Sequence, residues 1–183
     1  ADTAVARLCT DGGYSAYNDS AYRIDFSPLR ANFFPVVEQY GWGALAEDSL
    51  IRLTNQMAES CGAQISPILH SAIDSLEILD YDALIQGGAG AITHYFELYK
   101  YNELKSAIRT PVSIRMGLYG VNDLWNTLWQ LYVSHSSNSV NFDIENYVVE
   151  KMLDGLLQEM AVEEAFIRTD STHRDENTEL LGN

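Results

Sequence analysis

The stretch that decides the fold is residues 141–168, NFDIENYVVEKMLDGLLQEMAVEEAFIR, which carries the longest unbroken helical pattern in the chain. Asp143 can cap its start, because a side-chain carboxylate accepts hydrogen bonds from the free N–H groups of the first turn. At about 100° per residue, a set of apolar side chains falls on one broad arc. The arc consists of Val149, Met152, Leu153, Leu156, Leu157, Met160 and Ile167. This pattern predicts a long helix with one face in the core.

Gly155 interrupts this helix away from the centre of the apolar arc. A glycine in a helix interior costs about 1 kcal/mol relative to alanine. Its missing side chain would let another element approach the helix closely. The position therefore predicts a tight contact with a second segment of the chain.

Two acids, Glu163 and Glu164, project near the apolar arc towards the end of the helix. A buried carboxylate needs a cation or several hydrogen-bond donors, and in a cleft it could act as an acid, a base or a ligand. In the structural alternative, Glu164 pairs with Arg168 one turn later and Glu163 meets an arginine from another helix. We favour the structural alternative, because ion-pair networks explain such acids more often than functional sites do.

Apolar repeats and turn residues predict further helices along the rest of the chain. Ser27-Pro28 and Ser66-Pro67 each match a helix start with proline at the first helical position, and Pro111 is expected to interrupt a helix. The predicted helical segments are 3–9, 27–40, 44–61, 66–76, 81–86, 91–101, 112–133 and 143–168.

These segments predict an all-α, single-domain bundle of about six to eight helices around the long C-terminal helix. The domain is expected to span residues 1–168, with an irregular ordered loop at residues 11–26. After Arg168 the periodicity is lost, so residues 169–183 are expected to form a loosely held tail. A length of 183 residues, 46% of them apolar, suits one core, since domains commonly run to about 100–150 residues.

The most specific passage is FDIENYVVEKMLDGLL at residues 142–157, followed by AVEEAFIR at residues 161–168. It resembles the C-terminal signature of the domain of unknown function 4197 family, exported proteins known mainly from bacteria. Residues 21–24, 83–96 and 120–128 resemble the same family in the same order. The resemblance covers nearly the whole chain. It implies an all-helical exported domain of unassigned activity, with no catalytic residues to carry over.

The chain carries a formal net charge of −15 at pH 7 and has a pI near 4.4. A nucleic-acid backbone or an anionic membrane would repel such a protein at long range, so neither is an expected partner. No apolar run approaches the roughly 18–20 residues needed to span a bilayer. A cationic partner, or a saline or lumenal surrounding, fits this charge better.

The first residues, Ala1-Asp2-Thr3, resemble a chain start left by signal cleavage after small residues, which fits either export processing or a shortened chain. With the family resemblance, they predict an exported protein in the periplasm or an organelle lumen. There, Cys9 and Cys61 could form one disulfide between the N-terminal segment and the third helix, which we favour over two buried free thiols. Their spacing does not match a zinc site.

Trp125 and Trp129 lie one turn apart on a segment whose apolar arc is wide. An arc this wide exceeds what one small core needs, so the pair predicts a surface for a protein partner or an apolar ligand. Tyr95 and Phe96 are expected to line the same groove. The alternative, and the more frequent case, is that both tryptophans belong to the core, because tryptophan is highly buried on average.

No arrangement in the sequence indicates a catalytic or metal site. The four histidines are scattered, and no Gly-x-Ser-x-Gly motif or Glu-x-x-His repeat is present. The glycine cluster at residues 87–90 lacks the lysine and the preceding strand of a phosphate-binding loop. We therefore expect no cofactor and no metal.

Three functional classes remain. We favour a non-catalytic exported domain that binds a protein or an apolar small molecule through the aromatic groove. The first alternative is an accessory subunit of a larger assembly, with or without a membrane. The second is an enzyme that uses Glu163 or Glu164 with His94, which requires these side chains to converge within about 3 Å of each other or of a bridging water.

Overall fold

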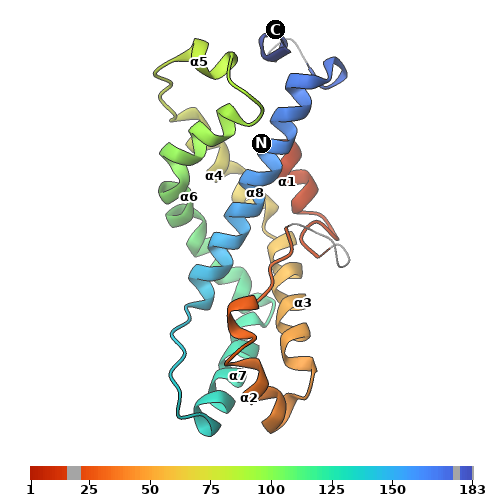
Figure 1. Ribbon diagram of the computed structural model, residues 1–183, viewed down its shortest axis with the longest axis vertical. Helices are drawn as coiled ribbons and strands as arrows, with labels where there is room; N and C mark the ends of the chain where they lie inside the picture. Colours follow the sequence, from red (N-terminus) through yellow and green to blue (C-terminus); the bar gives the residue numbers. More distant parts are fainter. Residues whose placement is uncertain (16–21, 175–177, 183) are drawn as a thin grey trace.

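The computed structural model describes residues 1–15, 22–174 and 178–182, and this part of the chain folds into eight α-helices without a strand (Figure 1). The predicted all-α class and the predicted range of helix number are confirmed. The helices are α1 (Asp2–Leu8), α2 (Phe34–Val37), α3 (Leu45–Glu59), α4 (Gly62–Asp74), α5 (Tyr81–Ile85), α6 (Ala91–Leu118), α7 (Val121–His135) and α8 (Ile144–Thr169). Shorter helical turns are η1 (Ser27–Leu29), η2 (Glu38–Trp42), η3 (Ser171–His173) and η4 (Glu179–Gly182).

Helix α8 runs along the molecule and packs mainly against α6, with α1 as a further neighbour (Figure 1). The side chain of Asp143 accepts a hydrogen bond from the Asn146 N–H at 2.9 Å, which confirms the predicted cap. Burying a large apolar side chain contributes about 1.5–3 kcal/mol. The apolar side chains that α8 buries are Ile144, Val148, Val149, Met152, Leu153, Leu156 and Leu157, whereas Met160 and Ile167 are half-buried.

Gly155 is buried where the loop residue Tyr14 crosses α8. A Cβ atom added at Gly155 would lie 3.2 Å from Cε1 of Tyr14. The hydroxyl of Tyr14 donates a hydrogen bond to the carbonyl oxygen of Met152 at 2.9 Å. The predicted close approach of a second segment at this glycine is confirmed.

Two prolines lie inside helices. Pro67 belongs to α4, which begins at Gly62, and Pro111 belongs to the continuous helix α6. An interior proline costs about 3 kcal/mol, because it removes a backbone hydrogen bond and clashes with the preceding turn. Burial of Ile108 and Val112 on either side of Pro111 offsets that cost. The predicted helix start before Pro67 and the predicted break at Pro111 are therefore wrong.

Two segments predicted as single helices are divided. The segment at residues 27–40 forms η1, α2 and η2 in succession, and α2 begins at Phe34 with Pro35 in its first turn. Pro35 has no N–H to continue an earlier helix, so a new start there is favoured. The segment at residues 112–133 is divided by Gly120, whose φ of 73° suits glycine.

Two buried polar side chains of α3 hold the N-terminal loop. The Asn55 amide oxygen accepts a hydrogen bond from the Ile24 N–H, and its NH₂ group donates to the Ile24 carbonyl, both at 2.9 Å. The Glu59 carboxylate accepts hydrogen bonds from the backbone N–H groups of residues 14–15 at 3.1 and 2.8 Å. Residues 16–21 of the predicted irregular loop lie outside the described residues.

The chain after α8 folds back on the last turn of that helix. Arg174 donates hydrogen bonds to the carbonyl oxygens of Ile167 and Arg168 at 2.7 and 2.8 Å, and both η3 and η4 contact α8. Residues 175–177 and 183 of the predicted tail lie outside the described residues. Among the described helices, none is both long enough and apolar enough to cross a membrane.

Candidate functional site

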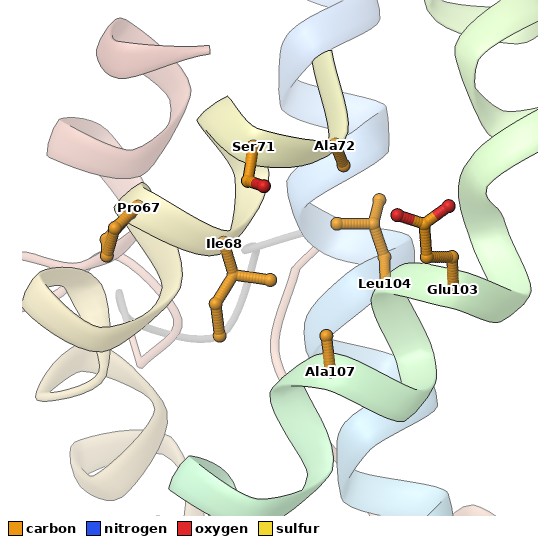
Figure 2. A pocket seen from close by; sticks show the side chains of 7 residues that line it. All are labelled: Pro67, Ile68, Ser71, Ala72, Glu103, Leu104 and Ala107. Atoms are coloured by element: carbon orange, nitrogen blue, oxygen red, sulfur yellow. The ribbon is translucent and has the colours of Figure 1, made fainter. Parts of the chain in front are cut away.

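An open hollow of about 310 Å³ lies between α4 and α6. Figure 2 shows the side chains of Ile68, Leu104 and Ala107 pointing into the space between the two helices. Leu104 and Ala72 are buried and Ile68 is half-buried, so the floor of the hollow is apolar. The lining residues are Pro67, Ile68, Ser71 and Ala72 from α4 and Glu103, Leu104 and Ala107 from α6.

Short side chains keep this space open. Ala72 from α4 and Ala107 from α6 end at Cβ, so neither crosses the gap between the helices (Figure 2). Protein interiors are close-packed, and a space of this size between two packed helices would otherwise hold larger side chains. The hollow can therefore accept apolar groups from outside the chain.

A second hollow of about 230 Å³ lies about two turns away along α6, where the segment that follows α4 faces that helix. The hydroxyl of Tyr95 donates to the Glu77 carbonyl at 2.8 Å and accepts from the Leu79 N–H at 3.3 Å, which fixes the segment after α4 against α6. Leu79 is 76% exposed and Tyr99 is 53% exposed, so this hollow also offers apolar surface. Its lining residues are Ser75, Leu76, Glu77, Leu79, Tyr95, Tyr99 and Lys100.

Lys100 and Glu103 form a polar bridge where the two hollows adjoin. The Lys100 ammonium donates hydrogen bonds to Ser75 Oγ and to the Glu103 carboxylate, both at 2.8 Å. The side chain of Lys100 is 13% exposed and that of Glu103 is 56% exposed. The bridge thus hides the cation and leaves the carboxylate facing solvent. We call the two hollows with this bridge the α4–α6 groove.

The predicted binding surface is mostly part of the core. Trp125 is 9% exposed and stacks on Phe33, with 5.0 Å between the ring centroids. Trp129 is half-buried and stacks on the same ring at 6.2 Å, and Phe96 is buried. Of the four predicted residues, Tyr95 alone lines the groove. The prediction is corrected for Trp125 and Phe96, which are core residues, whereas the half-buried Trp129 lies outside the groove.

Glu164 binds the start of α6. Its carboxylate accepts hydrogen bonds from the Ile92 N–H at 3.0 Å and from both the N–H and the hydroxyl of Thr93 at 2.8 Å. These backbone N–H groups belong to the first turn of α6, where no helical carbonyl is available to accept them. A carboxylate from α8 therefore caps another helix.

Arg168 pairs with Glu164 and binds the carbonyl oxygens at the end of another helix. Its guanidinium pairs with Glu164 at 2.8 Å, and the two side chains are 8% and 7% exposed. It also donates hydrogen bonds to carbonyl oxygens around the end of α5, where unpaired acceptors are found. The accepting carbonyls are those of Leu84, Ile85 and Gly87, at 2.8, 2.8 and 3.1 Å. The predicted structural pairing of Glu164 with Arg168 is confirmed.

Glu163 also has a structural partner. Arg7 of α1 contacts Glu163 and donates to Glu159 at 2.9 Å, so one cation serves two buried carboxylates of α8. The hydroxyl of Tyr22 donates to the other oxygen of Glu159 at 2.5 Å. Burial and this hydrogen bond raise the pKa of Tyr22 to about 12. The predicted arginine from another helix is confirmed as Arg7.

His94 does not join these acids. Its side chain is 79% exposed and lies 3.6 Å from Glu97, one turn along α6. Glu163 and Glu164 are instead engaged by the arginines described above, so the convergence that the enzyme alternative requires is not observed. Within the described ranges, no group of three or more His, Cys, Asp or Glu side chains is placed to hold a metal ion.

Cys9 and Cys61 are free thiols, so the predicted disulfide is not formed in this structure. The segments are nevertheless adjacent, because a Cβ atom added at Gly62 would lie 2.7 Å from Cβ of Cys9. Burial raises the pKa of Cys9 to about 12 and that of Cys61 to about 11, since it disfavours the charged thiolate.

Native thiols are therefore expected to react slowly. At pH 8.5, raised pKa values lower the thiolate fraction by about 100-fold or more, so iodoacetamide should label the folded protein at least that much more slowly than the protein in guanidinium chloride. Equal rates in the two states would contradict this expectation. The ordinary pKa of these thiols in an unfolded chain is 9.0. Their contribution to folding stability is therefore fully present below pH 9 and is lost as pH rises through 11–12.

A polar hollow of about 250 Å³ between α6 and α8 is lined by Lys105 and Arg109 among other residues. Lys105 pairs with Glu150 at 2.5 Å and Arg109 pairs with Glu145 at 2.6 Å. The hydrogen bond from Lys105 lowers the pKa of Glu150. Because each cation is neutralised by a carboxylate, this hollow offers no net positive charge to an anionic ligand.

Little in the sequence points to the α4–α6 groove. Its apolar floor comes from two helices that are far apart along the chain, and its open space results from short side chains, which carry no distinctive motif. One usable signal is the four-residue spacing of Tyr99, Glu103 and Ala107. This spacing puts all three exposed residues on one face of α6.

Neither the curated proteins nor the solved structures compared with this chain include a match. A family model described as "Protein of unknown function (DUF4197)" matches residues 1–183. The match agrees with the resemblance carried by residues 142–168, which form most of α8 and its capping segment. The chain therefore belongs to the DUF4197 family of proteins of unknown function.

Proposed function

We propose that this protein is a non-catalytic binding domain whose α4–α6 groove takes apolar side chains of a partner protein. The single observation that carries the proposal is the open apolar hollow of about 310 Å³ between Ile68, Leu104 and Ala107. Apolar hollows with a few polar groups at their edge are the common form of a binding site. The Lys100–Glu103 bridge supplies the polar groups here.

The shape of the groove favours a protein partner over a small molecule. Sites for drug-sized ligands enclose about 300–1,000 Å³ and bury most of the ligand surface. The volumes of the two hollows, about 310 and 230 Å³, lie just above and below the lower limit of that range, and both hollows open to solvent. Side chains projecting from a larger surface need no enclosure, because the rest of the partner excludes water from the contact.

A neutral apolar dye tests the groove directly. N-phenyl-1-naphthylamine, which fluoresces in apolar surroundings, is expected to bind the wild-type protein weakly. The variant Ala107→Trp should abolish the signal, because the indole would fill the first hollow. The matched variant Asn126→Trp places the same ring on an exposed position of α7 and should bind dye as the wild type does.

Equal dye signals from the two tryptophan variants would contradict the proposal. If native mass spectrometry instead found a small apolar molecule bound to the wild type and absent from Ala107→Trp, the occupant would be a small ligand and not a protein. The structural roles of Glu163 and Glu164 give no support to the enzyme alternative, while the accessory-subunit alternative and export stay predictions.

A further inference from the structure

The two hollows of the α4–α6 groove have a helical spacing. On α6, the first hollow is lined by residues 103, 104 and 107, and the second by residues 95, 99 and 100. Their mean positions differ by about seven residues, or roughly 10 Å at the helical rise of 1.5 Å per residue. That distance equals the separation of residues i and i+7 on a second helix lying along the groove.

The walls of the groove favour a helix over an extended strand. The α6 wall and the α4 wall of the first hollow are helices whose backbone N–H and C=O groups are paired within the helix. In the second hollow the irregular segment 75–79 faces α6, and its Glu77 carbonyl and Leu79 N–H are bonded to the Tyr95 hydroxyl. An extended peptide gains most of its affinity by adding to an exposed sheet edge, and the groove has no such edge. A helix needs side-chain pockets at regular intervals, which the two hollows supply.

The charge at the groove favours a cationic occupant. Glu77 lines the second hollow and is exposed, whereas the charge of Glu103 at the first hollow is offset by its ion pair with Lys100. The cation of Lys100 is already held by Glu103 and Ser75 and is mostly hidden from solvent. The net charge of −15 adds a long-range attraction for cations.

The same charges disfavour a second copy of this chain. Two chains of −15 repel each other at long range. A symmetric contact through the groove would also bring Glu77 and Glu103 of one copy close to the same acids of the other. The occupant is therefore a different protein.

We propose that the α4–α6 groove binds a basic amphipathic helix of a partner protein. Two apolar anchors, at positions i and i+7 of that helix, fill the two hollows. A lysine or arginine side chain beside the anchor in the second hollow pairs with Glu77. This proposal rests on the proposed function and adds the chemistry, the secondary structure and the spacing of the occupant.

Designed helical peptides test each part of this proposal by fluorescence anisotropy. The first peptide has about 15 residues, with alanine and lysine throughout and two leucines at i and i+7. The second moves one leucine to i+5, which turns the anchors about 140° apart on the helix. The third keeps the leucines and replaces every lysine with glutamate.

The first peptide is expected to bind, and the other two at least about tenfold more weakly. Its affinity should also fall as salt screens the charges. Binding should weaken about tenfold or more to Ala107→Trp, which fills a hollow, and to Glu77→Lys, which reverses a groove charge. The controls Asn126→Trp and Glu97→Lys make the same changes outside the groove and should bind like the wild type.

Three results would overturn the proposal: equal binding of all three peptides, equal binding to groove and control variants, or no binding by the first peptide. Dye binding that is lost in Ala107→Trp, without binding of the basic peptide, would leave the apolar groove in place and refute the basic helix. If Ala107→Trp kept both the dye fluorescence and the peptide binding of the wild type, both proposals would be refuted.

Discussion

Replacing Glu164 with alanine is expected to lower the free energy of unfolding by about 3–5 kcal/mol, the usual cost of removing one partner of a buried ion pair. The variant leaves the Arg168 guanidinium, 8% exposed, without its carboxylate. It also leaves the N–H groups of Ile92 and Thr93 without their acceptor at the start of α6. Urea denaturation followed by circular dichroism measures the change.

The matched control is Glu97→Ala, which removes the same side chain from an exposed pair with His94 on α6. Exposed ion pairs contribute about 0–1 kcal/mol, so this variant should remain close to the wild type. The double variant of Glu164 and Arg168 should lose less stability than the sum of the two single changes, because both act in one contact. A Glu164→Ala protein as stable as Glu97→Ala would refute the structural role.

Replacing Trp125 with alanine is expected to cost about 3–5 kcal/mol, the usual loss for an aromatic side chain removed from a core. The indole is 9% exposed and contacts the rings of Phe33, Trp129 and Phe142, with centroid distances of 5.0, 5.8 and 5.7 Å. Deleting it leaves a cavity between α2 and α7 that these rings cannot fill without moving. Thermal and urea denaturation both measure the loss.

Tyr81→Ala is the control for this change, because Tyr81 is 64% exposed on the short helix α5. It should change stability by less than about 0.5 kcal/mol, as exposed substitutions usually do. If Trp125→Ala lowered the free energy of unfolding no more than Tyr81→Ala, Trp125 would be a surface residue. It would then again be a candidate binding residue.

The course of α8 could be predicted from the sequence because its determinants are local. The apolar arc from Val149 to Leu157, the cap at Asp143 and the pairing of Glu164 with Arg168 all depend on residues within a few turns of each other. Such features can be derived from the 3.6-residue period alone. Gly155 indicated a close approach, although not that Tyr14 makes it.

Features that depend on distant segments could not be derived in this way. The arginine that meets Glu163 comes from α1, at the other end of the chain. Pro67 and Pro111 stay inside helices because tertiary burial outweighs the local penalty. Trp125 was predicted to line a surface but is buried for the same reason, since it stacks on Phe33 from a separate segment.

The acids of the chain fall into two groups that differ in burial. Glu159, Glu163 and Glu164 lie on the buried side of α8 and hold α1 and α6 through arginine and backbone contacts. Glu103 and Glu77 lie at the open groove and face solvent. Charge alone does not separate these two groups in the sequence, whereas burial does.

Amide hydrogen exchange along α8 tests most directly whether this helix is the buried centre of the fold, against which α6 and α1 pack. The amides of residues 148–157 are predicted to exchange only through global unfolding, with a free energy equal to that of urea denaturation. Exchange of these amides at the rates of a solvent-exposed helix, while the protein remains folded, would contradict the account.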